Sequence, residues 1–114
     1  MKADAVRGHL DGVLLAVLEA GPLHGYAIIT AVQRRSGGAL ELRTGTIYPA
    51  LSRLERTGLL RGSWESSGER RRRSYALTDA GRRRLADERT AWREFTAVIG
   101  SVLNPAPPAA GNAV

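Results

Sequence analysis

Cysteine, aromatic residues and long apolar runs are absent or scarce in this chain of 114 residues. The lack of cysteine excludes disulfides, thiolate metal ligands and a cysteine nucleophile. Aromatic residues make up 5% of the chain, so the core must come mainly from the aliphatic part of the 43% hydrophobic fraction. The longest apolar runs, such as residues 13–18, are too short to cross a bilayer, and residues 1–12 lack the apolar region of an export signal. We therefore expect a soluble cytoplasmic protein with one domain, or with one domain and a dimerisation arm.

Patterns typical of catalysis and metal binding are also missing. His9 and His24 are the only histidines and the acids are scattered, so no metal site is expected. The chain has no Walker loop and no paired nucleophile and base, so we expect neither catalytic residues nor a cofactor. His24, directly before Gly25 and Tyr26, is expected to help fix the start of a helix.

Arginine supplies nearly all of the positive charge, since Lys2 is the only lysine. The net charge is +6, and residues 61–84 account for +5 of it, with eight arginines against three acids. Positive charge concentrated in one segment of a small protein is typical of a surface that binds a phosphate backbone. The alternative is a cationic protein in which the charge serves only solubility.

Two helices are expected in the first third of the chain. Apolar residues keep a spacing of three and four through residues 5–20, which predicts a helix that Gly21-Pro22 ends. A second helix is expected over residues 23–35, with an inward face formed by Tyr26, Ile29 and Val32. Residues 39–43 alternate in character, which fits a short strand or an extended linker.

The stretch TGTIYPALSRLERTGLL, residues 44–60, predicts a third helix. Its apolar residues repeat at helical spacing and should face the core; they are Ile47, Leu51 and Leu54. Pro49 lacks an N–H and is best tolerated in a first turn, which favours Thr46 as the N-cap. The alternative is a helix that begins earlier and bends at Pro49. Gly58 is the expected end.

A basic hairpin and a long helix should follow. Residues 59–65 and 73–78 carry strand-type residues, and the SSGERRR segment between them is typical of a charged turn. Thr78-Asp79 is expected to cap a last helix that runs to Leu103. The final segment NPAPPAAGNAV has no periodicity and is expected to be disordered.

This order of elements predicts a mainly α fold with a small β-hairpin, the winged helix-turn-helix, followed by a long C-terminal dimerisation helix. We divide the chain into a winged helix-turn-helix DNA-binding domain at residues 1–78, the dimerisation helix at residues 79–103 and a disordered tail at residues 104–114. In such folds the third helix enters the major groove of DNA.

Three motifs, in this order, resemble those of the PadR-type transcriptional regulators. They are GPLHGYAIITAVQRRSGG, then LRTGTIYPALSRLERTGLL, then a Trp followed by RRRSYALTDAGRRRL and W-x-x-F. A helix-turn-helix pattern alone is weak, but HGY, TxYPxLxRLExxG and RxxYxLTxxG together are specific. The resemblance covers residues 10–100 and implies a dimeric repressor that binds an inverted-repeat operator. It also implies that some members release DNA when a small aromatic compound binds.

The polar face of the third helix is the first candidate DNA-binding surface. Its hydroxyls, phenol and guanidinium can reach phosphates and base edges, and the helix N-terminus attracts phosphate. The candidate contacts are Thr46, Tyr48, Pro49, Ser52 and Arg53. The alternative for Arg53 is an ion pair with Glu55 or Glu41. Glu55 is a candidate anchor for the wing through an arginine, and Arg56, nearer the helix C-terminus, is left out of the set.

The run of four arginines in the hairpin is the second candidate DNA-binding surface; it consists of Arg70, Arg71, Arg72 and Arg73. Side chains alternate across a strand, so two or three of them should face the minor groove or its phosphates. Gly68 lets the hairpin turn tightly, and Trp64 is expected to pack under the wing. The arginines at 82–84 are as consistent with a solvated helix surface, beside which Gly81 should permit close packing.

The last helix carries apolar residues at heptad-like spacing. Leu85, Trp92 and Ile99 are seven residues apart, as are Glu88, Phe95 and Val102, with Glu88 the exception. The pattern predicts a dimer seam made of Leu85, Trp92, Phe95, Val98 and Ile99. The alternative is that this face packs on the chain's own helices. The resemblance further implies that an aromatic at the position of Trp92 lines a cavity for flat apolar ligands, against the plainer interpretation of a dimer core without a ligand.

These expectations combine into a sequence-specific DNA-binding regulator, a homodimeric repressor released by a small aromatic effector. The expected partners are double-stranded DNA and a second copy of the chain, with no membrane. Two other classes stay open: a winged-helix module that binds an acidic protein partner, and an architectural protein that binds DNA without sequence preference.

Overall fold

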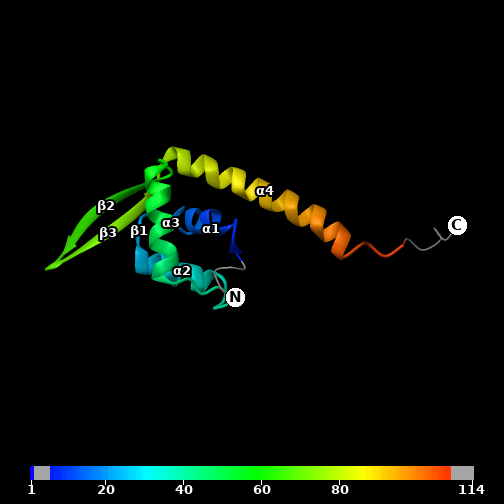
Figure 1. The fold of residues 1–114 in the computed structure, drawn as a ribbon, viewed down its shortest axis with the longest axis horizontal. Coiled ribbons are helices and arrows are strands. Elements are labelled where there is room, and N and C mark those ends of the chain that lie inside the picture. Colours follow the sequence, from blue (N-terminus) through cyan, green and yellow to red (C-terminus); the bar gives the residue numbers. More distant parts are fainter. Residues whose placement is uncertain (2–5, 109–114) are drawn as a thin grey trace.

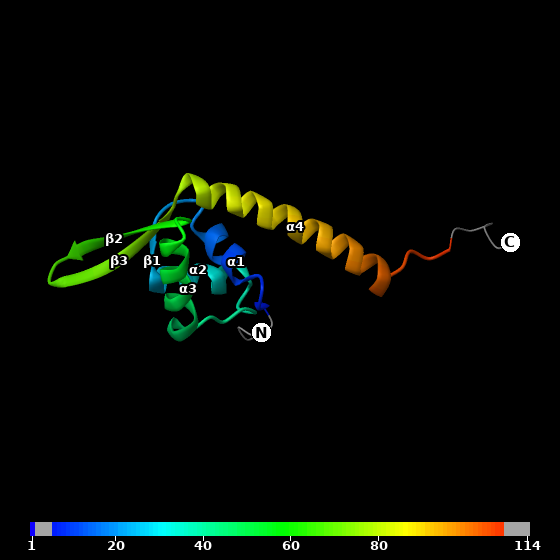
Figure 2. The ribbon, with the colours of Figure 1, turned by 45° about the horizontal axis from the view of Figure 1, so that its top comes forward.

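The computed structural model describes residues 1 and 6–108. Along the chain the elements are α1 (Leu10–Val17), β1 (Leu23–His24), α2 (Gly25–Arg35), α3 (Thr44–Arg56), β2 (Leu60–Ser67), β3 (Arg70–Leu77) and α4 (Asp79–Leu103). Helices α1, α2 and α3 form a head, from which the β2–β3 hairpin, here called the wing, projects on one side and α4 extends on the other (Figure 1). The second view keeps this arrangement (Figure 2). The predicted winged helix-turn-helix with a long last helix is therefore confirmed.

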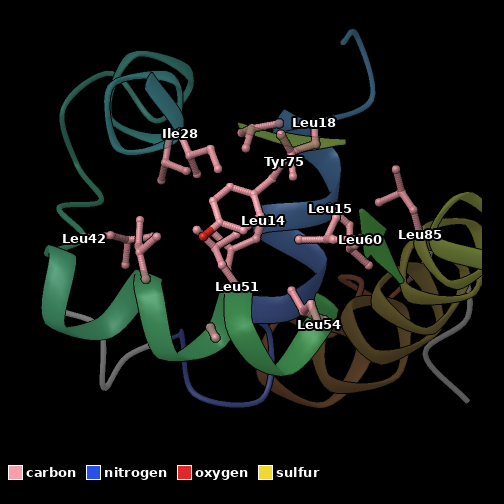
Figure 3. Packing of buried hydrophobic residues seen from close by; sticks show 14 of the residues in the cluster. Leu14, Leu15, Leu18, Ile28, Leu42, Leu51, Leu54, Leu60, Tyr75 and Leu85 are labelled. Atoms are coloured by element: carbon pink, nitrogen blue, oxygen red, sulfur yellow. The ribbon is translucent and has the colours of Figure 1, made fainter. Parts of the chain in front are cut away.

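The core of the head is aliphatic, as the composition requires. The fully buried side chains come from α1 and the turn after it, from α2 and from α3; they are Leu14, Leu15, Leu18, Ile28, Ile47, Leu51 and Leu54. Figure 3 shows the labelled members of this cluster converging, with the ring of Tyr75 from β3 among them. Each fully buried Leu or Ile contributes about 1.5–3 kcal/mol relative to an exposed one, so the cluster holds α3 firmly in the head.

The first two helices are shorter than predicted. Helix α1 begins at Leu10 because Gly8 takes φ +87°, a left-handed conformation that interrupts a helix, and the predicted start at residue 5 lies outside the described residues. At the start of the predicted second helix, residues 23–24 form a strand instead. The inward orientation predicted for Tyr26 is wrong, since it is 71% exposed, while Ile28 takes the buried position.

Helix α3 begins two residues before its predicted cap. Arg43 is the N-cap residue and no side chain caps the helix, so the prediction of Thr46 as N-cap is wrong. The carbonyl of Arg43 accepts hydrogen bonds from the N–H groups of Thr46 and Ile47, each at 3.0 Å, which closes the first turn earlier. Pro49 is therefore inside the helix, where it offers no N–H to the carbonyl four residues before it.

Gly58 ends α3, as predicted. Its φ of +80° suits a glycine, and its N–H bonds to the carbonyl of Glu55 at 3.1 Å. The N–H of Leu59 bonds to the carbonyl of Leu54 at 2.9 Å. These two bonds form a Schellman motif, which satisfies the last carbonyls of the helix and turns the chain into β2.

The hairpin belongs to a three-stranded antiparallel sheet of order β1-β3-β2. Both hairpin strands extend farther toward the tip than predicted, so the arginine run lies within β3 and not in the turn. The connection is only Gly68-Glu69, with Gly68 at φ +65°, as a tight two-residue turn requires. Strand β1, which pairs Leu23 with Tyr75, was not predicted because two residues are too few to show alternation.

Helix α4 begins at the predicted cap. The hydroxyl of Thr78 accepts a hydrogen bond from the N–H of Gly81 at 3.0 Å. A methyl group on Gly81 would overlap the carbonyl of Leu59, so the close packing predicted at this glycine is confirmed. Farther along, Arg89 donates two hydrogen bonds to Glu19, at 2.9 and 3.0 Å, and these lower the pKa of the Glu19 carboxyl. The cap and this pair thus both connect α4 to the residues that precede it in the head.

Two segments have no regular structure. Residues 39–43 are an extended linker, one of the two predicted forms, and Leu40 and Leu42 anchor it in the core. Residues 104–108 contain no helix or strand, and residues 109–114 of the predicted disordered tail lie outside the described residues.

Candidate nucleic-acid interface

The exposed face of α3 lies opposite the residues that it buries. Ile47, Ala50, Leu51 and Leu54 point into the head. The exposed side carries residues at helical spacing from one end of the helix to the other, namely Gly45, Tyr48, Pro49, Ser52, Arg53 and Arg56. Among the predicted contacts on α3, only Thr46 is half-buried. Apart from Thr46, the structure thus brings these candidates to one accessible surface, and their contact with DNA stays a prediction.

Arg53 is held by an acid from another helix. Its guanidinium donates to both carboxylate oxygens of Asp11 in α1, at 2.9 and 2.5 Å. These hydrogen bonds are the larger cause, and the charge of Asp11 the smaller cause, of a raised pKa for Arg53. The pairing that the sequence suggested, with Glu55 or Glu41, is wrong because Asp11 lies closer in space although it is distant in sequence. Because an exposed pair contributes only about 0.2–1 kcal/mol, a phosphate can compete with Asp11 for Arg53.

Arg56 is a candidate that the sequence reasoning left out. It is exposed on the same side of α3 as Pro49 and Ser52. Among the described residues it has no acidic partner, in contrast to Arg53. Its four- and seven-residue spacing from Ser52 and Pro49 had already predicted that it lies on this face, and only its position near the helix C-terminus kept it out of the predicted set.

The wing separates its arginines by strand alternation, as predicted. Arg71 and Arg73 lie over the ring of Trp64, with their guanidinium carbons 4.9 and 5.1 Å from its centroid. Arg70 and Arg72 alternate with them on the other face of β3, and both are exposed. Trp64 does not pack under the wing as predicted, because it is 57% exposed and carries the two guanidinium groups on its ring.

Arg73 also connects the wing to α3. It donates a short hydrogen bond to the carboxylate of Glu55, and both side chains are about three-quarters buried. A methyl group on Gly62 would lie 2.5 Å from Glu55 Oε1 and 2.7 Å from Arg73 Nη2, so this glycine leaves room for the pair. The candidate role of Glu55, anchoring the wing through an arginine, is confirmed. We call Glu55, Gly62, Trp64 and Arg73 the brace.

The base of the wing meets α2 near two buried or half-buried rings. Burial raises the pKa of the Tyr75 phenol, while the nearby charge of Arg73 opposes that shift. His24 occupies the N-cap position, at the start of α2 as expected, but its side chain makes no capping hydrogen bond. Its Nε2 lies 3.5 Å from the carboxylate of Glu65 in the wing instead. The brace and this contact both fix the wing relative to the head.

The predicted seam on α4 divides into a buried and an exposed part. Leu85 is buried in the head's own core, so it is not available to a partner. Glu88, the exception in the heptad pattern, pairs with Arg84 at 2.9 Å and packs beside Gly12 of α1. The remaining large apolar residues of α4 are exposed; they are Trp92, Phe95, Val98, Ile99, Val102 and Leu103. So many exposed apolar side chains on one helix are unusual for a monomer and typical of an interaction surface.

Trp92 belongs to a cluster of three rings. It stacks on Phe95 with centroids 5.9 Å apart, and His9 meets its edge at 5.1 Å. His9 had no predicted role, because only the fold brings the turn before α1 to α4. The cluster thus places three aromatic rings together at the start of the exposed part of the seam.

The part of the chain that the structure describes lacks two other kinds of feature. No group of three or more His, Asp or Glu residues there is placed to hold a metal ion. In the same part of the chain, no helix combines the length and apolar character needed to span a membrane.

The chain is similar in sequence and in structure to known transcriptional regulators. Residues 14–87 match the model of the transcriptional regulator PadR-like family. A PadR family transcriptional regulator from Eggerthella lenta has a similar structure, with a TM-score of 0.80 and 29% identity over 90% of this chain and 88% of that one. A transcriptional regulator of Mycobacterium tuberculosis is 40% identical over 63 residues, which cover 55% of this chain and 59% of that protein.

Bacillus subtilis PadR in complex with operator DNA matches with a TM-score of 0.63 and 29% identity, over 68% of this chain and 45% of that one.

Proposed function

The chain belongs to the PadR-like family of transcriptional regulators, and on that premise we propose that it is a repressor that binds an inverted-repeat operator in the cytoplasm as a homodimer. The observation that carries the proposal is the placement of the exposed face of α3 beside the arginine-rich wing. A helix of this kind fits the major groove, and a basic hairpin beside it fits the minor groove and its phosphates. The relative from Bacillus subtilis, crystallised with operator DNA, supports binding to DNA as such.

The wing and α3 divide the work in this proposal. Arg70, Arg71 and Arg72 neutralise phosphates, which supplies affinity without sequence preference. Tyr48 and Ser52 set the register of the helix and supply part of the base readout, because a phenol and a hydroxyl can donate to and accept from base edges. Architectural binding is the competing function, and it differs in lacking this second contribution.

The homodimer would form through the exposed part of the seam. Trp92, Phe95, Val98 and Ile99 would pair with the same residues of a second copy, which removes the apolar surface of α4 from water. Two α3 helices held about one turn of DNA apart can then read the two halves of a palindrome. An Ile99→Glu variant should therefore become monomeric in sedimentation and lose operator binding, whereas Arg83→Glu on the exposed start of α4 should stay dimeric.

An effector would act on the same seam. The stacked rings of Trp92 and Phe95 offer a surface for a flat aromatic compound, and its insertion would change the spacing of the two α3 helices. Titration of candidate aromatic compounds should quench Trp fluorescence and release operator DNA. If neither occurs for any compound, this part of the proposal is wrong and the rings serve only the dimer.

The first experiment is fluorescence anisotropy with labelled duplex from upstream of the protein's own gene, against a scrambled duplex, across a salt series. A repressor should prefer the native duplex by about 10³-fold or more. Similar binding to both duplexes would favour an architectural role or an operator elsewhere. Binding to neither at physiological salt would favour a module that docks its arginine-rich wing onto an acidic protein.

A further inference from the structure

The ring of Tyr48 in α3 packs directly against Gly25 in α2. Gly25 is the first residue of α2 and is buried. A methyl group on it would overlap the phenol oxygen of Tyr48, and would stand 2.6 Å from Cζ and 2.8 Å from Cε1 of the ring. Real side chains do not make carbon contacts this short. The ring of Tyr48 therefore lies in the space that any other residue at position 25 would fill.

The backbone gives no reason for a glycine at this position. The glycines with positive φ are elsewhere in the described chain, so Gly25 has a conformation that other residues also adopt. Gly45 in α3 shows the contrast, since a methyl group there would meet no atom within 4 Å. At Gly25 the reason is the space for the ring.

The position of the ring decides where its hydroxyl points. Tyr48 lies at the edge of the exposed face of α3 and is 37% exposed, so part of the ring is enclosed and part is accessible. The hydroxyl end is the part nearest to Gly25, so the phenol lies along the junction of α2 and α3 in the space that Gly25 leaves open. A side chain held in one rotamer before binding loses less conformational entropy when it contacts a ligand.

We propose that Gly25 is a positioning residue for Tyr48. Because Gly25 has no side chain, the phenol of Tyr48 can take the orientation in which that phenol contacts operator DNA. The inference rests on the proposed function for its DNA readout, but not for its structural readout. Gly25 itself need not touch DNA. Its effect on binding is transmitted entirely through the ring of Tyr48.

A double-mutant cycle tests this directly. The four proteins are wild type, Gly25→Ala, Tyr48→Ala and the double variant, each measured for operator affinity and for thermal unfolding. Gly25→Ala alone should weaken operator binding about tenfold, the value of one displaced hydrogen bond to a charged group, and should lower the melting temperature. In the Tyr48→Ala background the same change should alter affinity by less than about twofold and should no longer lower the melting temperature, because the overlap is gone.

Gly12→Ala is the matched control. It also places a methyl group on a helical glycine, but this group makes ordinary contacts of 3.4–3.6 Å with Glu88, so both affinity and stability should be retained. If Gly25→Ala fails to fold but the double variant with Tyr48→Ala folds, that result would still support the proposed packing of the Tyr48 ring against Gly25. Equal losses from Gly25→Ala with and without the Tyr48 ring would overturn the proposal, as would unchanged melting and affinity in Gly25→Ala. If wild type binds no operator, the proposed function fails. The melting temperatures alone then still test whether the Tyr48 ring packs in the space at Gly25.

Discussion

Helix α3 and the wing stand side by side, yet they differ in how they are held and in what they present. Helix α3 buries Ile47, Leu51 and Leu54 in the core and exposes small or neutral groups with few charges. Strand β3 has four arginines among its eight residues and projects from the head on a two-stranded ladder. A rigid helix with specific groups suits base readout, and a charged hairpin suits phosphates. The difference indicates which part of the interface supplies specificity and which supplies affinity.

The largest expected effect concerns the exposed face of the wing. Arg70→Ala with Arg72→Ala should weaken binding to operator and scrambled duplex alike, by at least about tenfold, because hydrogen bonds to charged groups contribute about 1.5–3 kcal/mol each. The slope of log affinity against log salt should fall by about 2. Arg82→Ala with Arg83→Ala removes the same charge from the start of α4 and should leave the slope within about 0.5 of wild type. Equal slopes in both double variants would mean that only the total charge matters.

A smaller effect is expected from the brace, where the two regions are joined. Arg73→Ala and Glu55→Ala should each lower operator affinity several-fold, and the double variant should lose no more than the worse single variant, because the residues act as one unit. The stability cost should be about 1 kcal/mol, since both side chains are partly exposed. Arg83→Ala, which removes an exposed arginine of α4 outside both the wing and α3, is the control and should leave operator affinity unchanged. Additive losses in the Arg73 and Glu55 cycle would show that the two residues act separately.

The smallest expected effect concerns the ion pair that holds α3 to α1. Asp11→Asn should cost about 0.2–1 kcal/mol of stability and should strengthen binding to both duplexes by roughly two- to threefold, because Arg53 becomes available to a phosphate. Urea unfolding and anisotropy measure the two quantities. If binding does not change while stability falls, Arg53 lies away from DNA and leaves the set of contacts.

Much of the fold was predictable because its signals are local. Gly58 stops α3 and Thr78 caps α4 through groups within a few residues of themselves, and these boundaries were predicted. The start of α3 and strand β1 were not predictable in this way. Arg43 caps without a side-chain bond, and β1 exists only because β3 lies beside it. Tyr26 was misplaced because its spacing fits an inward face, whereas the buried stripe of α2 runs through Ile28.

The exposure of most candidate residues was predictable from the sequence, but the partners of their side chains were not. Alternation along β3 predicted that the arginines divide between two faces. That Arg53 pairs with Asp11, 42 residues away, depends on how α1 crosses α3, and no spacing in the sequence reports that distance. The same holds for Trp64, whose exposed ring is explained by the guanidinium groups above it. The packing of the Tyr48 ring against Gly25 likewise depends on how α2 and α3 meet.

The most direct test of the division between α3 and the wing is the ratio of scrambled to operator dissociation constants, measured by anisotropy at one salt concentration. Three proteins suffice: wild type, Tyr48→Ala with Ser52→Ala, and Arg70→Ala with Arg72→Ala. If α3 reads sequence and the wing binds phosphates, the α3 variant should lose most of the ratio while the wing variant keeps it despite weaker binding to both duplexes. A ratio that collapses in the wing variant and persists in the α3 variant would contradict this account.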